Sequence, residues 1–185
     1  MLSLDGGGVR EIATVIFLSK LEKEIGKPLF EQFDFFVGTS AGAITAMAIS
    51  VAKMNGEGLM DLWSEKNLDR ILEASLWDSK LGLMQTNPKY DGAGKREVLR
   101  EYFGDLKLGE ARKKVAVMSY DIEKREPILL TSYNDPSITL VDAGSATSAA
   151  PIYYPTAKVG DRYLIDGGIV ANNPIINNFL FKIQK

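Results

Sequence analysis

The stretch FDFFVGTSAGAITAMAISVA, residues 33–52, decides the fold. Its first five residues, 33–37, form a compact apolar run that is typical of a β-strand and stops at Gly38. Residues 41–52 are apolar almost all round, which predicts a helix buried on every side. The stretch therefore predicts a strand and a helix joined by a sharp turn in the middle of a core.

Strand-like and helix-like segments alternate outward from this stretch. Residues 1–5 read as a strand that stops at three glycines, and residues 9–25 carry apolar positions at helical spacing. Residues 114–121 and 127–133 read as the two strands of a hairpin. The alternation in the first half of the chain predicts an α/β fold, a three-layer α/β/α sandwich around a largely parallel central sheet.

Composition and charge limit the number of domains and the classes of partner that the chain can have. No internal repeat or linker divides the chain, so we expect one domain over residues 1–185, with flanking segments missing beyond its abrupt ends. The net charge of 22 − 24 = −2 leaves no basic excess to hold nucleic acid. No run of about eighteen apolar residues is present, so no transmembrane helix is expected.

Histidine and cysteine are both absent from the sequence. Without histidine, a Ser-His-Asp triad and every zinc site that contains histidine are excluded. Without cysteine, a thiolate nucleophile is excluded, and the composition fits a reducing compartment, so a cytoplasmic location is expected. Any proton moved in catalysis near neutral pH must then be carried by a carboxylate, a lysine or a tyrosine.

Residues 38–42, GTSAG, match the pattern G-x-S-x-G in the strand-turn-helix context that this motif requires. The small residues Gly38 and Gly42 let neighbouring segments come close, so Ser40 is predicted to sit on a strained turn with its hydroxyl exposed. The backbone N–H of Ala41 would point at a substrate oxygen that becomes negatively charged. The alternative is a glycine- and serine-rich turn that only caps a helix.

Residues 5–10, DGGGVR, follow the first strand and open the first helix. Three consecutive glycines expose backbone N–H groups, which form an anion site at a helix N-terminus. An oxyanion hole, a phosphate cradle for a nucleotide and a tight turn without a ligand all remain open. The nucleotide interpretation is disfavoured because the dinucleotide fingerprint needs glycine where Glu11 stands, and no Walker lysine follows.

Asp166 closes a strand-like run over residues 162–166 and is followed by Gly167 and Gly168. These glycines give the carboxylate room to approach another loop, so Asp166 is the best-placed base for Ser40. Partial burial beside the serine would raise the pKa of Asp166 and strengthen it as a base. The alternative is that Asp166 only orders its own turn. Weaker candidates for the base stand near other element ends: Asp5, Asp121 and Asp142.

The elements DGGGVR (5–10), GTSAG (38–42) and DGG (166–168) stand in this order along the chain. Together with ATSAAP at 146–151 and NNP at 172–174, they resemble the patatin-like phospholipase family over nearly the whole chain. The resemblance implies a lipid acyl hydrolase that uses a Ser-Asp dyad, with no histidine, metal or organic cofactor.

Matching the motifs residue by residue, the resemblance implies that Ser40 is the nucleophile and Asp166 its base. Arg10 matches the family arginine that steadies the glycine loop. The oxyanion-hole N–H groups would come from four residues: Gly6, Gly7, Gly8 and Ala41. The two turns would be supported by four glycines: Gly38, Gly42, Gly167 and Gly168.

The family usually reads DGGGxRG, and here Glu11 replaces the last glycine. We expect Glu11 in the first turn of the helix, where a carboxylate interacts favourably with the helix dipole. A side chain turned toward the oxyanion hole would weaken catalysis, which leaves a weakly active binding module open as an alternative.

The resemblance also implies the substrate, a phospholipid or other fatty-acyl ester cleaved in the manner of a phospholipase A or lysophospholipase. Apolar residues between positions 59 and 84, among them Trp63 and Trp77, predict either a cap that opens on a membrane or ordinary core packing. The cap interpretation implies a peripheral membrane contact, and the core-packing interpretation does not. The alternative function is an esterase or thioesterase for small soluble acyl groups.

Overall fold

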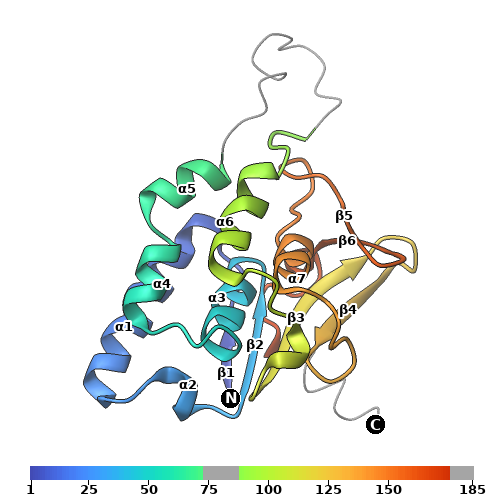
Figure 1. Cartoon of the computed structure of the whole chain (residues 1–185). Helices are drawn as coiled ribbons and strands as arrows, with labels where there is room; N and C mark the ends of the chain where they lie inside the picture. The colour runs from blue at the N-terminus through green and yellow to red at the C-terminus, as the bar shows by residue number, and fades with distance from the viewer. Residues whose placement is uncertain (73–87, 176–185) are drawn as a thin grey trace.

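The computed structural model of the chain describes residues 1–72 and 88–175. Within these ranges, six strands form one sheet in the order β1-β2-β3-β6-β5, and β4 pairs with β3 off this path (Figure 1). The strands are β1 (Leu2–Leu4), β2 (Phe35–Thr39), β3 (Lys114–Asp121), β4 (Glu126–Thr131), β5 (Ala157–Val159) and β6 (Arg162–Asp166).

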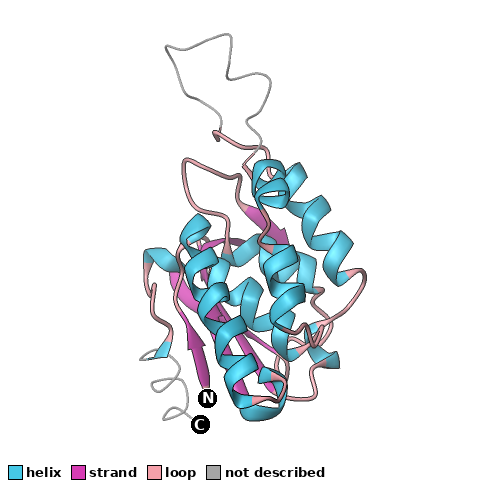
Figure 2. Cartoon of the chain, turned by 90° about the vertical axis from the view of Figure 1, so that its left-hand side faces the viewer, coloured by secondary structure: helices cyan, strands magenta, loops and turns pink. Residues whose placement is uncertain are grey.

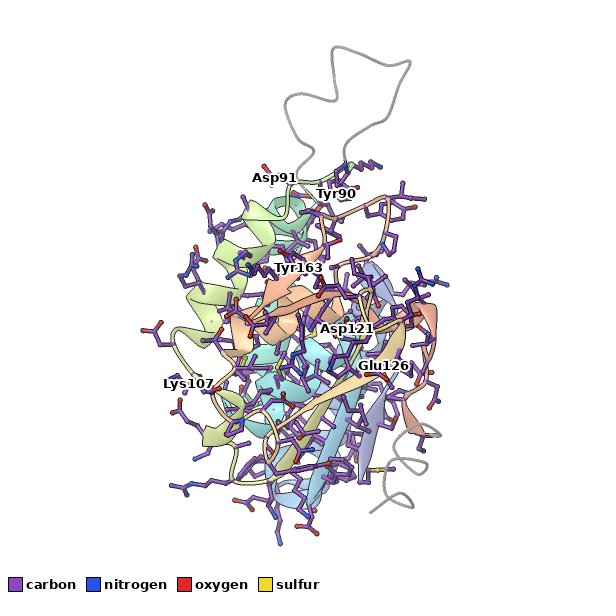
Figure 3. The ribbon with its side chains drawn as sticks, turned by 90° about the vertical axis from the view of Figure 1, so that its right-hand side faces the viewer. Tyr90, Asp91, Lys107, Asp121, Glu126 and Tyr163 are labelled. Atoms are coloured by element: carbon purple, nitrogen blue, oxygen red, sulfur yellow. The ribbon has the colours of Figure 1, made fainter. Side chains whose placement is uncertain are left out.

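Strand β3 is the centre of the sheet, and the directions of its neighbours differ. Strands β1, β2 and β3 run parallel to one another. Strands β4 and β6 run antiparallel to β3, and β5 runs antiparallel to β6. The β3–β4 pair is the predicted hairpin, and Asp121 and Glu126 lie opposite each other where it turns (Figure 3). The predicted α/β class with a central sheet is confirmed.

The helices lie together on one face of this sheet, as the view from that side shows (Figure 2). The α-helices are α1 (Glu11–Ile25), α2 (Leu29–Gln32), α3 (Ala41–Ser50), α4 (Gly56–Leu62), α5 (Glu65–Ile71), α6 (Ala93–Phe103) and α7 (Leu140–Thr147). Short 3₁₀ helices are η1 (Gly8–Arg10), η2 (Leu108–Glu110) and η3 (Gly167–Ile169).

Helix α3 is the centre of the helical layer, because every one of its residues is buried. It contacts β1, β2 and β3 on one side and α1, α2 and α7 on others. This confirms the prediction that the apolar segment after GTSAG forms a buried helix. The apolar positions of β2 alternate between faces: Phe36 belongs to the core under the helices, and Val37 belongs to a smaller cluster on the opposite face.

The structure changes one predicted strand end and shows how one of the two tryptophans packs. Strand β2 does not stop at Gly38 but continues to Thr39, because Gly38 pairs with Leu4 on one side and Val117 on the other. Of the two tryptophans for which a cap and core packing were both open, Trp63 is buried, as core packing predicts, and donates its indole N–H to Thr45 Oγ1 at 3.1 Å. Trp77 lies outside the described residues.

Adjacent residues of α1 offer a test of which face supports the fold. Leu18 is 1% exposed, whereas its neighbour Phe17 is 63% exposed. Leu18→Ala should lower the free energy of unfolding by about 2–5 kcal/mol, because it leaves a cavity in the core. Phe17→Ala should change it by no more than about 0.5 kcal/mol. Urea denaturation measures both, and equal losses would contradict the assignment of the buried face.

Candidate active site

Ser40 occupies the single-residue turn between β2 and α3. Its backbone has φ 53° and ψ −126°, a conformation that costs energy for a residue with a side chain. A Cβ atom at Gly38 would collide with the backbone of Ala43, and one at Gly42 would collide with the carbonyl of Asp5. Both glycines are therefore required by the close approach of α3 to β1 and β2, as the GTSAG motif predicts.

Ser40 and Asp166 lie in direct contact. The Ser40 hydroxyl donates a hydrogen bond of 2.7 Å to Asp166 Oδ2. The other carboxylate oxygen, Asp166 Oδ1, accepts the backbone N–H of Gly168 at 2.7 Å. Asp166 is only 8% exposed, so both interactions are largely shielded from water. The two residues expected to form a dyad are thus brought together from positions that lie 126 residues apart.

The pairing pattern of β3 explains why these distant residues meet. Strand β4 occupies one edge of β3 along residues 116–121. Strand β2 occupies the other edge and ends with Thr39 opposite Met118. Strand β6 takes over that same edge, with Asp166 opposite Ser119. Because β6 runs antiparallel, its carboxyl end meets the carboxyl end of β2 head-on.

The C-terminal end of α7 and the residues after it bind the backbone of both Ser40 and Asp166. The hydroxyl of Thr147 accepts the Ser40 N–H at 2.8 Å and donates to the carbonyl of Met118. Two residues later, the carbonyl of Ala149 accepts the Asp166 N–H at 3.1 Å. The backbone on both sides of the contact is thereby attached to one short stretch of chain.

Opposing effects act on the protonation of Asp166. Burial raises the pKa of its carboxyl above the ordinary range. The Gly168 N–H, the Ser40 hydroxyl and the positive charge of Lys95 each lower that pKa. A carboxylate in this setting is less solvated, and therefore a stronger base, than one in water.

The glycine loop lies beside the serine, but its three N–H groups are not equivalent. The N–H of Gly6 donates to the carbonyl of Asn172 at 3.0 Å, which fixes the loop in place. The N–H groups of Gly7, Gly8 and Ala41 donate to no acceptor within residues 1–72 and 88–175. They are therefore the groups that can donate to an anion at this site.

The remaining predicted residues have supporting positions. Gly167 packs against the backbone of Met118, where a Cβ atom has no room. Arg10 closes the glycine loop through its backbone N–H, which donates to the carbonyl of Gly7 at 3.1 Å. Its side chain is exposed and lines the cavity described below.

Glu11 turns away from the site. Its side chain is 1% exposed, and one carboxylate oxygen, Oε1, is buried without a hydrogen-bond partner among the described residues. Burial, together with the smaller effect of the Asp5 charge, raises the pKa of its carboxyl from 4.5 to about 7. Glu11 does not line the cavity around Ser40, so nothing in its position blocks the glycine loop.

A cavity of about 770 Å³ opens over Ser40 and Asp166. One end is polar and consists of the glycine loop and the two contacting side chains. The wall beyond them is apolar and comes mainly from helices α3 to α6: Ile44, Leu62, Trp63, Leu68, Ile71 and Leu99. A largely apolar cavity whose lining includes a hydroxyl and a carboxylate in contact suits a molecule with a long apolar part and one reactive polar group.

Sequence reasoning missed Lys95, which lines this cavity although it is only 4% exposed. Its spacing is the signal that could have found it. Lys95, Val98, Leu99 and Tyr102 follow the i, i+3, i+4, i+7 pattern, so a charged residue stands on the apolar face of α6. Asn172 and Thr147 lie in motifs noted above, but their hydrogen bonds depend on tertiary contacts that sequence spacing does not reveal.

The described residues lack two other features. No cluster of three or more acidic, histidine or cysteine side chains in these ranges could hold a metal ion. No helix in the same ranges is long and apolar enough to cross a membrane.

Comparison with known proteins agrees with the fold and the motifs. The sequence model of the family described as "Patatin-like phospholipase" matches residues 2–177. A "cGAMP-activated phospholipase" of Pseudomonas aeruginosa is 33% identical over 94% of this chain and 54% of its own length. "Patatin-like protein 4" of Arabidopsis thaliana is 32% identical over 95% of this chain and 50% of its own length. The chain thus spans about half the length of these relatives.

Among solved structures, VipD from Legionella pneumophila superposes with a TM-score of 0.64 at 14% identity. The match covers 90% of this chain and 45% of VipD. At this identity the likeness concerns the fold alone.

The buried carboxyl of Glu11 predicts a specific pH dependence of stability. Its pKa is about 7 in the folded chain and near 4.5 when exposed, so the folded state keeps the proton longer as pH rises. The contribution of Glu11 to the free energy of unfolding should therefore fall as the pH rises from 4.5 to about 7. Glu11→Gln removes this titration and should be more stable than the wild type by about 1–3 kcal/mol at about pH 8, with little difference at about pH 4.

Urea denaturation at the two pH values measures this gap. Glu31→Gln is the matched control, because Glu31 is exposed and its replacement should leave the pH dependence unchanged. A gap between Glu11→Gln and the wild type that does not vary with pH would show that Glu11 is not protonated in the folded state.

Proposed function

Because the chain belongs to the patatin-like phospholipase family, we propose that it is a lipid acyl hydrolase that cleaves fatty-acyl esters through a Ser40–Asp166 dyad. The observation that carries this proposal is the 2.7 Å hydrogen bond from Ser40 Oγ to Asp166 Oδ2 at the polar end of an apolar cavity. The chemistry we propose is that of a phospholipase A or a lysophospholipase.

In the first half of the reaction, Ser40 Oγ attacks the carbonyl carbon of the ester while Asp166 Oδ2 accepts the hydroxyl proton. The carbonyl oxygen becomes negatively charged and receives hydrogen bonds from the N–H groups of Gly7, Gly8 and Ala41. One such donor typically contributes about 2.7–4 kcal/mol to transition-state stabilisation. The intermediate collapses, the alcohol leaves with the proton from Asp166, and the acyl group stays on Ser40.

In the second half, Asp166 takes a proton from a water molecule, and the resulting hydroxide attacks the acyl carbonyl. The same N–H groups stabilise the oxyanion. The bond to Ser40 Oγ then breaks, the proton returns to the serine, and the fatty acid is released. The acyl chain would lie along the apolar wall that helices α3 to α6 provide.

The surroundings of the cavity support a lipid surface as the source of substrate. Several residues that line the cavity are also exposed, namely Val9, Tyr153 and Ile169. Ile152, between the lining residues Pro151 and Tyr153, is 75% exposed. Exposed apolar side chains around an opening can enter the boundary layer of a membrane. We propose that this rim makes a peripheral contact with the bilayer.

The dyad is tested by two substitutions that keep the shape of each side chain. Ser40→Ala and Asp166→Asn should each lower kcat for a fatty-acyl ester by at least about 10²-fold while the circular dichroism spectrum stays unchanged. Asp121→Asn is the control, since Asp121 accepts the N–H groups of Glu123 and Lys124 at 3.0 Å and can keep them as an amide. Full activity in either dyad variant would remove that residue from the mechanism.

The membrane contact is tested at Ile152. Ile152→Glu should reduce hydrolysis of phosphatidylcholine in vesicles several-fold and leave hydrolysis of a soluble short-chain ester unchanged, because a charge at the rim resists entry into the bilayer. Phe17→Glu places the same charge on an exposed apolar site of α1, outside the cavity, and should affect neither substrate. Unchanged vesicle hydrolysis in Ile152→Glu would refute the contact. A wild-type protein that cleaves only the soluble ester would favour the small-substrate esterase instead.

A further inference from the structure

Residues 147–149, which begin at the last residue of α7, accept three hydrogen bonds in succession. The two outer positions bind the backbone N–H groups of Ser40 and Asp166, as described above. The central carbonyl, that of Ser148, accepts a hydrogen bond of 2.9 Å from Lys95 Nζ. Lys95 is therefore attached to the same short segment that positions the nucleophile and its base.

The Lys95 side chain is held on two sides. Besides its bond to the Ser148 carbonyl, Nζ lies 3.6 Å from the centre of the Tyr154 ring, a distance at which a cation is attracted to the ring face. The Tyr154 hydroxyl is itself fixed by the carbonyl of Ile71 at 2.9 Å. Among the described residues, Ser148 provides the one hydrogen-bond acceptor of this ammonium group. Such a buried charge is costly unless it faces a charge of opposite sign.

Asp166 provides that opposite charge. Lys95 and Asp166 line the same cavity, and each shifts the pKa of the other toward its charged form. Arg96, the next residue of α6, acts in the opposite direction on Lys95, and burial lowers the pKa of Lys95 to about 7. The Tyr154 phenol also lies near the ammonium, and Tyr90, which is labelled in Figure 3, packs against the Tyr154 ring.

We propose that Lys95 is a positioning residue of the dyad: it braces the 147–149 segment through the Ser148 carbonyl, and its charge keeps the Asp166 carboxyl ionised and ready to accept the serine proton. This inference rests on the proposed function. Asp166 can take a proton from Ser40 only when it is charged, and burial alone would favour its neutral form. Lys95 offsets that effect without forming an ion pair that would occupy the carboxylate oxygens.

The test is the pH profile of kcat/KM for a neutral, soluble short-chain ester. Lys95→Met keeps the length of the side chain and removes the charge. Its acid limb should move to higher pH by about one unit, so that kcat/KM on the acid side falls about tenfold. Lys95→Arg remains charged at all relevant pH values, so its acid limb should stay at the wild-type position even if kcat is lower.

Two further variants complete the design. Lys53→Met is the matched control, because Lys53 also lies near an aromatic ring, Phe30 at 5.6 Å, but is exposed and does not line the cavity. Its profile should be that of the wild type. Lys95→Gln keeps a donor for the Ser148 carbonyl and should shift the acid limb as Lys95→Met does, which covers the case in which Lys95→Met does not fold.

The outcomes separate this inference from the proposed function. A wild type without esterase activity, or an active Ser40→Ala variant, would refute the function itself. An active wild type together with Lys95→Met and Lys95→Gln variants whose acid limbs do not move would refute the role of Lys95 alone. A raised KM for anionic phospholipids with an unchanged pH profile would make Lys95 a substrate-binding group and would also overturn the inference.

Discussion

Strands β2 and β6 pair with successive parts of the same edge of β3, and the position of the site depends on this arrangement. Strand β2 occupies that edge as far as Met118, and β6 occupies it from Ser119 onward in the opposite direction. The turn after β2 and the turn after β6 must therefore meet at one point of the sheet. The Ser40–Asp166 hydrogen bond follows from this geometry, and the close packing at Gly38, Gly42 and Gly167 keeps the turns from moving apart.

Burial gives three charged side chains of this structure different roles. Asp166 is buried but keeps hydrogen-bond donors on both oxygens and a cation nearby, so it can act as a base. Lys95 is buried beside it and is held by one carbonyl and one ring. Glu11 is buried at the start of α1, no cation among the described residues lowers its pKa, and burial raises that pKa to about 7. The three side chains therefore differ in role because their hydrogen-bond partners and neighbouring charges differ.

Local sequence patterns predict many of the helices and strands of this structure. The features that they do not predict depend on contacts between residues far apart in the sequence. The apolar segment over residues 41–52 predicted α3, and the two strand-like runs at 114–121 and 127–133 predicted the β3–β4 hairpin. The antiparallel entry of β6 was not predicted, because a short strand with Asp166 at its end looks the same in either direction. The burial of Lys95 was not predicted for a similar reason. A lysine on a helix is usually solvated, and only the contacts of Lys95 with residues 148 and 154 show that it is buried.

The central claim is that the Asp166 carboxylate activates the Ser40 hydroxyl. The most direct measurement is mass-spectrometric mapping of the adduct that a fluorophosphonate forms, because only an activated serine reacts quickly with this reagent. The account predicts rapid, single-site modification of Ser40 in the wild type and a rate at least about 10²-fold lower in Asp166→Asn. Modification of a different residue, or equal rates at Ser40 in both proteins, would contradict it.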